Sequence, residues 1–235
     1  MRSIPLFTPA ETHICPYLEG REAQSQYVDP RIEPDLDTMS ALSRLGFRRS
    51  GKLIYRPSCP SCRECQSIRI PTAEFSPSKN MRRVLARTRH WRVSVCDLSD
   101  SPEFFDLYCR YINARHKDGD MYPPSRQTYD EFIGESQGNT QLLLAEDDTG
   151  VIGVLVFDRF NDGLSAVYCF YEPEREHESV GTSMILRLTL IARSLGLPYN
   201  YLGYYVENCR KMSYKARFSP LEVLSDNDWI RLNPA

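Results

Sequence analysis

Long apolar runs are absent from this chain. Nowhere in its 235 residues does an apolar stretch approach the roughly 18 residues that a membrane-spanning helix needs. The N-terminal stretch before Arg21 also lacks the apolar core of a secretory signal. Together these absences predict a cytoplasmic protein. Thiols stay reduced in that compartment, and clustered cysteines there more often bind metal or act catalytically than form disulfides.

A strong net charge is absent as well. The 29 Lys and Arg residues against 31 Asp and Glu residues leave a formal charge of −2. The molecule as a whole therefore does not attract nucleic acid, although a local patch can. The hydrophobic content of 41% and the charged content of 26% are typical of a soluble globular protein. Internal repeats are missing, and the length suits one large domain or two small ones.

Cysteine is not scarce, and three cysteines stand at an unusual spacing. The run CPSCREC places Cys59, Cys62 and Cys65 in a C-x-x-C-x-x-C pattern. With Cys15 as a fourth ligand, these thiolates would suit a zinc ion or an iron–sulfur cluster. A packed loop with ordinary thiols is the alternative, and a disulfide fits a reducing compartment less well.

A basic segment without any acidic residue follows the cysteine loop. From Ser76 to Val93 the pattern predicts one amphipathic helix, with apolar side chains such as Met81 and Leu85 on one half. The other half is basic and carries Lys79, Arg82, Arg83, Arg87 and Arg89. Such a face would suit a phosphate backbone. A merely solvated face and a contact with an acidic protein are the alternatives.

The order of the predicted elements indicates an α/β (α+β) fold. Helices are expected over Pro102–His116 and Ser125–Glu135, followed by an antiparallel meander, a further helix and a returning strand. The strands are predicted at Gln141–Glu146, Val151–Asp158, Leu164–Tyr171 and Asn200–Val206. This order resembles acyltransferases of the GNAT (N-acetyltransferase) architecture, with a mixed, largely antiparallel sheet.

Three parts are expected along the chain. Residues 1–75 form a small N-terminal cysteine-containing unit, with a helix near Asp35–Gly46 and strands at Lys52–Arg56 and Gln66–Pro71. Residues 76–100 hold the basic helix and a connecting strand, and residues 101–235 form a GNAT-like transferase domain.

The place where a GNAT-type enzyme binds the pyrophosphate of acyl-CoA is poorly suited to an anion here. Such enzymes use a glycine-rich turn at a helix N-terminus, whose free N–H groups favour negative charge. The corresponding stretch EREHESVGTSM has one glycine, Gly181, and acids at Glu174, Glu176 and Glu178. The sequence therefore predicts an acyl donor other than acyl-CoA.

Tyrosines crowd around a glycine near the C-terminus. Strict strand alternation would put Tyr201 and Tyr205 on one face with Gly203, and Tyr204 on the other. Basic residues follow within the same stretch, Tyr199 to Phe218, and aromatic rings beside cations suit stacking on a nucleotide base. Tyrosines in a core beside a solvated basic tail are the alternative.

Several of these motifs, taken in order, resemble one known family. The runs GFRRSGKLIYRP, RHKDGDMYPP, FYEPE, SVGTS and YLGYYVENCRKMSYK are similar to the arginyl-tRNA–protein transferases, and the similarity runs from about Cys15 to Trp229. The C-x-x-C-x-x-C run resembles the bacterial branch, the aspartate/glutamate leucyltransferases.

The resemblance implies a reaction and its partners. Such enzymes move an aminoacyl group from a charged tRNA to the N-terminal amine of a protein. The bacterial branch uses leucyl-tRNA and acceptors that begin with Asp or Glu, and the product is marked for degradation by the N-end rule pathway. The resemblance implies no cofactor for the chemistry itself. Metazoan and fungal members carry N-terminal cysteines implicated in metal binding, and Cys15 and Cys62 match those positions, whereas Leu18 stands where another cysteine would be.

The resemblance also leads to site hypotheses. The basic helix becomes the expected tRNA contact. An acidic acceptor needs a cation, which suggests Arg48 and Arg49 first and Lys215 and Arg217 next. The aromatic Tyr201 and Tyr205 are further expected substrate contacts. Tyr168, Tyr204 and Lys215 are the expected catalytic residues, with the tyrosines as hydrogen-bond donors.

The sequence is also compatible with other functions. An arginyl-tRNA donor with the same acceptors fits the same motifs. An acyl-CoA N-acetyltransferase with a degenerate cofactor turn, or a non-catalytic module that binds tRNA or acidic N-termini, is a more distant alternative. The sequence predicts no oligomeric state.

Overall fold

A computed structural model describes residues 4–99, 101–119, 121–134 and 138–232 of the chain. Its strands are β1 (Leu6–Phe7), β2 (His13–Ile14), β3 (Glu22–Ala23), β4 (Ser25–Val28), β5 (Arg48–Ser50), β6 (Leu53–Pro57), β7 (Gln66–Pro71), β8 (Arg92–Asp97), β9 (Thr140–Asp147), β10 (Gly150–Phe160), β11 (Gly163–Tyr171), β12 (Tyr199–Tyr205), β13 (Leu221–Ser225) and β14 (Asp228–Leu232). Its α-helices are α1 (Leu36–Arg44), α2 (Lys79–Arg87), α3 (Pro102–Arg115), α4 (Arg126–Tyr129) and α5 (Val180–Ser194). A π-helix η1 (Asp130–Gly134) and the 3-10 helices η2 (Pro173–Glu178) and η3 (Ser213–Phe218) complete the list.

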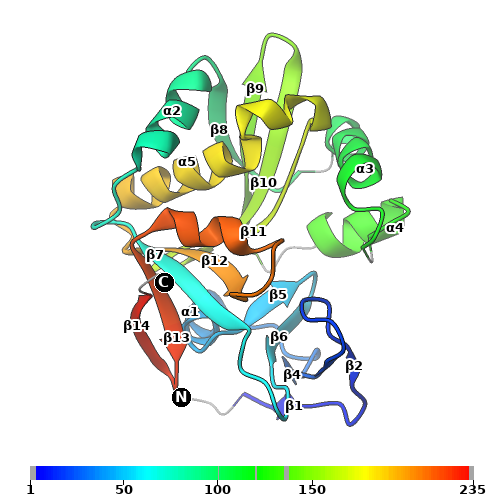
Figure 1. Cartoon of the computed structure of the whole chain (residues 1–235). Helices are drawn as coiled ribbons and strands as arrows, with labels where there is room; N and C mark the ends of the chain where they lie inside the picture. Colours follow the sequence, from blue (N-terminus) through cyan, green and yellow to red (C-terminus); the bar gives the residue numbers. More distant parts are fainter. Residues whose placement is uncertain (1–3, 100, 120, 135–137, 233–235) are drawn as a thin grey trace.

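Two principal sheets organise these elements (Figure 1). The larger sheet has the strand order β14-β13-β7-β12-β11-β10-β9-β8, and the smaller one has the order β1-β4-β6-β5. Neighbouring strands of the larger sheet are antiparallel except β11 and β12, which are parallel. The predicted mixed, largely antiparallel sheet and its central meander β9-β10-β11 are therefore confirmed.

Helices cover both faces of the larger sheet. On one face α5 packs its apolar side against β9, β10 and β11, through side chains such as Met184, Leu188 and Leu155. On the other face α3 and α4 pack against the same strands, through Leu107, Tyr129 and Val154. Because strand side chains alternate between faces, a strand buried on both sides needs apolar residues throughout, and the composition of β9 and β10 follows that pattern.

A further core cluster joins the smaller sheet to the larger one. Met39 and Leu42 of α1, with Phe47 and Ile54, pack against Phe160 and Tyr201 of the larger sheet. Helix α1 starts where the Asp35 carboxylate accepts a hydrogen bond from the Thr38 N–H at 2.8 Å. The packing of this cluster holds β5, and with it Arg48 and Arg49, beside the central strands.

Two expectations change in detail. The strand predicted at Gln66–Pro71 is present, but it pairs with β12 and β13 of the larger sheet. The helix predicted over Ser125–Glu135 is α4 followed by the π-helix η1, and residue 135 lies outside the described ranges. The division of the chain at residues 75 and 100 stays a prediction.

The basic helix is shorter than predicted. It ends at Arg87 rather than continuing to Val93, and Thr88 is the C-cap residue, whose side chain donates a hydrogen bond to the Val84 carbonyl at 3.0 Å. The next residues form strand β8, whose alternating RVSVCD pattern has a period of two rather than of a helix. Within the described parts of the chain no helix has the length and apolarity to cross a bilayer.

Candidate active site

The central strands β11 and β12 separate and leave a cavity between them. Among the described residues their parallel pairing is confined to three positions, Gly163 with Tyr199, Leu164 with Asn200 and Ser165 with Tyr201. Both strands continue beyond this point, and a cavity of about 250 Å³ lies at the opening. Its walls come from α1, β5, β6, η1, β10, β11, β12 and η3, including Arg48, Ser165, Val167, Tyr204 and Lys215.

A bulge at Gly203 sets which tyrosines face this cavity. The pairing of β12 with β7 shifts between Tyr201 and Tyr204, and Gly203 has a φ of +73° that favours glycine. The bulge resets the alternation, so Tyr201 and Tyr204 both lie beneath Arg48 while Tyr205 packs in the core under α5. The predicted pairing of Tyr201 with Tyr205 on one face is therefore wrong, because it assumed a regular strand.

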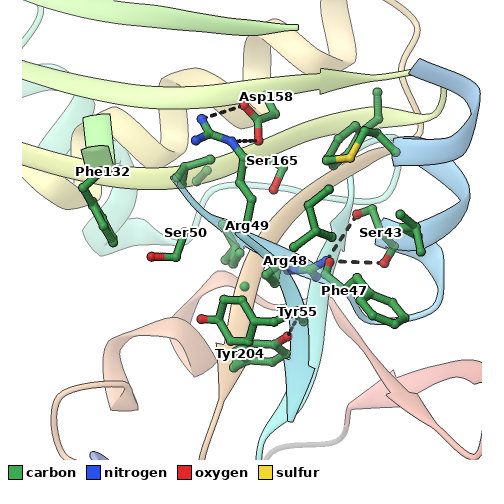
Figure 2. Close-up of a pocket in the computed structure, with 18 of the residues that line it drawn as sticks. Ser43, Phe47, Arg48, Arg49, Ser50, Tyr55, Phe132, Asp158, Ser165 and Tyr204 are labelled. Carbon is green, nitrogen blue, oxygen red and sulfur yellow. Dashed lines mark hydrogen bonds and ion pairs between the residues drawn. The ribbon is translucent and has the colours of Figure 1, made fainter. Parts of the chain in front are cut away.

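Arg48 is a cation with unused hydrogen-bond donors (Figure 2). Its Nη1 atom donates to the Phe47 carbonyl at 2.7 Å and to the Ser43 hydroxyl at 3.2 Å. Its Nε and Nη2 atoms are buried and have no partner within the described residues. The guanidinium lies over the rings of Tyr201 and Tyr204, at 5.3 and 5.9 Å from their centroids. Burial lowers the pKa of Arg48. Because Arg48 lines the cavity, an anion that enters it could accept hydrogen bonds from the Nε and Nη2 atoms.

Arg49, the second arginine predicted to bind the acceptor, is held in a buried ion pair. Its Nε and Nη2 atoms donate to the two carboxylate oxygens of Asp158 at 2.7 and 2.9 Å, and Nη2 also donates to the Thr140 hydroxyl at 3.1 Å. The Arg49 and Asp158 side chains are 1% and 2% exposed. This buried ion pair balances the charge of Arg49 and joins β5 to β10, and both partners also line the cavity.

Breaking this pair is expected to destabilise the fold. Arg49→Met leaves the Asp158 carboxylate buried without its cation, and a loss of about 3–5 kcal/mol in the free energy of unfolding is expected. Urea denaturation followed by circular dichroism measures it. The double variant Arg49→Met/Asp158→Leu is the control, because it removes both charges and should regain much of the loss. Equal stability of the single variant and the original chain would contradict the assignment.

Lys215 lies beside Arg48 in the same cavity. It is half-buried, and its Nζ donates to the Tyr204 carbonyl at 2.6 Å. Burial first and the Arg48 charge second, opposed by Cys209, together lower the pKa of Lys215 to about 8. A substantial fraction of the side chain is therefore a neutral amine near pH 8, and a neutral amine can accept a proton.

The two predicted catalytic tyrosines do not present hydroxyl donors to this cavity. The Tyr204 hydroxyl donates to the carbonyls of Gly46 at 3.0 Å and Tyr55 at 3.2 Å. Tyr204 therefore forms a wall of the cavity with its ring, and its hydroxyl is occupied. Tyr168 is not part of the described cavity lining and packs edge-on against Phe132 in the core under α3. Sequence alternation could not separate these positions because β11 and β12 diverge.

The remaining predicted substrate contacts also lie outside the described lining of the cavity. Tyr201 is fully buried, and its hydroxyl donates to Asp162 at 2.9 Å. Its ring packs against the Arg48 guanidinium. Tyr205 is half-buried in the core, and Arg217 is exposed on η3. Lining residues that sequence reasoning missed include Ser43, Ser50, Phe132, Ser165, Val167 and Met212. No motif marks them, since they come together only when β5, η1 and β11 meet.

The four cysteines predicted to bind metal gather around a neighbouring cavity. Cys15, Cys59, Cys62 and Cys65 all line it, and Tyr204 separates it from the first cavity. Backbone N–H groups of Leu18 and Gln24 and the side chain of Arg21 approach three of the sulfur atoms at 3.4–3.5 Å. Burial and the neighbouring thiols raise the pKa of Cys65 to about 12.

This arrangement does not fit a metal site. All four are free thiols, and the described residues contain no group of three or more His, Cys, Asp or Glu side chains placed to hold an ion. The metal-ligand hypothesis therefore gains no support from the geometry, and the chemistry proposed below uses no metal.

The basic face of α2 is exposed as predicted. Lys79, Arg82, Arg83 and Arg87 are all solvent-accessible, and Met81 is the buried residue of the helix. Arg82 and Arg83 make side-chain hydrogen bonds within their own segment, to Pro77 O and Asn80, and Arg87 donates to the His177 carbonyl. Arg89 lies in the turn after the helix end rather than on the helix.

Known proteins with similar sequences identify the family of this chain. Family profiles described as arginine-tRNA-protein transferase, N terminus and C terminus, match residues 13–83 and 103–225. A Hahella chejuensis protein named aspartate/glutamate leucyltransferase is 40% identical over 232 residues, which is 99% of each chain. A Marinobacter nauticus protein of the same name is 42% identical over 228 residues, or 97% of this chain and 96% of that one.

Solved structures with a similar fold were also found. FemX has a TM-score of 0.47 and 8% identity, and the match covers 87% of this chain and 83% of that chain. L-PGS from Bacillus licheniformis has a TM-score of 0.46 and 12% identity, over 71% and 49% of the two chains. The sequence relatives match over nearly their whole length, and both family profiles match in order. The chain therefore belongs to the arginine-tRNA-protein transferase family and, within it, to the aspartate/glutamate leucyltransferases.

Proposed function

We propose that this aminoacyltransferase moves leucine from leucyl-tRNA to the α-amine of proteins that begin with Asp or Glu. The observation that carries the proposal is Arg48, whose buried Nε and Nη2 atoms have no partner among the described residues and which lines the strand opening beside Lys215. A planar guanidinium with two free donors suits the carboxylate of an acidic first residue. The names of the relatives state the same acceptors and the same aminoacyl group.

The proposed reaction is an acyl transfer from an ester to an amine. The neutral α-amine of the acceptor attacks the ester carbonyl carbon of the aminoacyl-tRNA, and a C–N bond forms. The C–O bond to the terminal ribose then breaks, and the ribose oxygen leaves. Lys215 in its neutral form takes the proton that the amine loses and returns it to the leaving ribose oxygen. Much of the rate comes from holding the two substrates together, since the ester is already an activated donor.

The position of Arg48 relative to Lys215 makes the arrangement selective. Both residues line one cavity, so the carboxylate on Arg48 would hold the acceptor while its α-amine lies next to Lys215. An acceptor that begins with alanine lacks this anchor. Selection for acidic N-termini then arises from the same site that performs the transfer.

The test is direct transfer of labelled leucine. Purified chain is mixed with leucyl-tRNA and with peptides that are identical except for Asp, Glu or Ala at the first position. Label on the Asp and Glu peptides alone is the expected result. Absence of transfer with an active control enzyme present would overturn the proposal, and binding without a covalent product would favour a non-catalytic module.

An acyl-CoA donor is disfavoured by the start of α5. Glu178 lies there, is largely buried and is paired with Arg175, which is in turn paired with Asp147. The residue at the helix N-cap, Ser179, is in the left-handed conformation with a φ of +61° and makes no side-chain capping hydrogen bond. A pyrophosphate at this helix end would meet the carboxylate of Glu178 beside the N–H donors of the helix.

The basic face of α2 supports contact with the tRNA. Arg82→Glu/Arg83→Glu is expected to weaken tRNA binding at least about tenfold near 0.1 M salt and to lower the slope of log affinity against log salt concentration. Filter binding of leucyl-tRNA at several salt concentrations measures both. Arg31→Glu, at an exposed arginine of the N-terminal unit, is the control and should change neither. An unchanged salt slope in the double variant would remove α2 from the tRNA interface.

The biological setting follows from the product. A protein that gains an N-terminal leucine would be marked for degradation by the N-end rule pathway, which acts in the cytoplasm. We propose that setting for this chain as well.

A further inference from the structure

The cavity at the strand opening contains cations but no available anion. Among the described residues that line it, Asp158 is the only carboxylate. Its oxygens accept hydrogen bonds from Arg49 and from the Thr140 hydroxyl, the latter at 2.7 Å, and its side chain is 2% exposed. Arg48 and Lys215 have no carboxylate partner within the described part of the chain. The cavity therefore carries an uncompensated positive charge.

The same cavity also has an apolar wall. Phe132 of η1, Val167 of β11 and Met212 just before η3 all line it, and all three are half-buried. The Phe132 ring is held edge-on against Tyr168 at 5.6 Å between centroids. Figure 2 shows Phe132 well apart from Arg48 and Tyr204. The cavity thus has the Arg48 cation and, well apart from it, the apolar ring of Phe132, which suits two side chains of different chemistry.

We infer that this cavity chooses the donor: the apolar side chains of Phe132, Val167 and Met212 receive the leucyl side chain, and the Arg48 cation, in a described lining without a free carboxylate, rejects arginyl and lysyl side chains. The inference rests on the proposed function and adds the residues that decide its donor. An arginyl group would lose its hydration, meet no free carboxylate among the described lining residues and be repelled by the Arg48 cation. A leucyl group would bury apolar area against apolar side chains.

A graded preference among donors follows. Rejection of a charged side chain by a cavity of the same sign is expected to exceed about 100-fold, because charge burial and repulsion act together. Uncharged side chains of other shapes differ only by packing, which discriminates by about 10- to 200-fold. Methionine is therefore expected to be transferred less well than leucine but better than arginine.

The test must separate the aminoacyl group from the tRNA that carries it. Leucine, methionine and arginine are each charged onto one and the same tRNA, and kcat/KM for transfer to an Asp peptide is compared. The expected order is leucine, methionine, arginine, with arginine at least about 100-fold below leucine. Transfer of leucine and arginine at equal efficiency would overturn the inference and leave the proposed function intact. No transfer of leucine at all would overturn the proposed function.

A pair of variants then tests the wall itself. Phe132→Glu adds a carboxylate to the cavity. Phe132→Gln introduces a side chain of nearly the same shape as glutamate but without its charge. The leucine-to-arginine ratio is expected to fall at least about tenfold in Phe132→Glu relative to Phe132→Gln. Because the ratio cancels any general loss of activity, equal ratios in the two variants would overturn the inference. Val167→Glu and Val167→Gln give the same comparison if the Phe132 variants fail to fold.

Discussion

Arg48→Met is expected to remove the preference for acidic acceptors. Transfer to a peptide that begins with Asp should fall by about 100- to 1,000-fold in kcat/KM, since truncating one partner of a buried, hydrogen-bonded charge pair costs about 2–5 kcal/mol. Transfer to an Ala peptide should change little, because that acceptor makes no ion pair. The measurement is the ratio of the two efficiencies for each enzyme.

Two further variants make this result specific to the guanidinium. Arg48→Lys keeps the charge but loses the planar fork, so it should retain only part of the selectivity. Arg44→Met alters an exposed arginine in the last turn of α1 and should leave the ratio unchanged. An Asp-to-Ala ratio in Arg48→Met equal to that of the original chain would remove Arg48 from the acceptor pocket.

Lys215→Met is expected to slow transfer by about 100- to 10,000-fold, the usual contribution of a positioned general base. The loss should appear in single-turnover rates with saturating acceptor, because the proposed role of Lys215 lies in the chemical step. Lys211→Met is a close control, since Lys211 is exposed and paired with Asp118. A full single-turnover rate in Lys215→Met would exclude the base role.

The pH dependence separates a base from a residue that only shapes the cavity. Burial lowers the pKa of Lys215 from 10.5 to about 8, and the acceptor amine titrates at a pKa of about 7.7–8.0. Both groups must be neutral, so the log of kcat/KM should rise with pH at a slope approaching about 2 below pH 7 and level off above pH 8. In Lys215→Met one ionisation is gone, and the slope should approach about 1. Equal slopes in the two enzymes would contradict the assignment.

The same pKa predicts that the substitution is harmless to stability. The folded-state pKa of Lys215 is lowered below its unfolded value, so the protonated side chain opposes folding below pH 8. This opposition fades as the pH rises from 8 towards 10.5. Lys215→Met should therefore not lower the free energy of unfolding at neutral pH, and its kinetic loss can be read as chemistry.

The sequence alone determined the elements and their order. Apolar residues at helical spacing marked α3 and α5, and continuous apolar strands separated by turn residues marked the meander β9-β10-β11. These patterns are local, since burial of a strand or a helix face leaves its period in the chain. The family was also apparent there, because its motifs are contiguous runs such as the one that contains Arg48.

Only the tertiary structure decided which of two adjacent arginines is free. Arg48 and Arg49 are neighbours with the same chemistry, but β5 turns Arg49 to the buried Asp158, more than a hundred positions further along the chain, and leaves Arg48 in the cavity. The lowered pKa of Lys215 likewise depends on burial beside a residue distant in sequence. The bulge at Gly203 reversed the tyrosine faces, and the separation of β11 from β12 created the cavity itself. Each of these depends on how strands distant in the sequence meet, and a residue pattern carries no record of that.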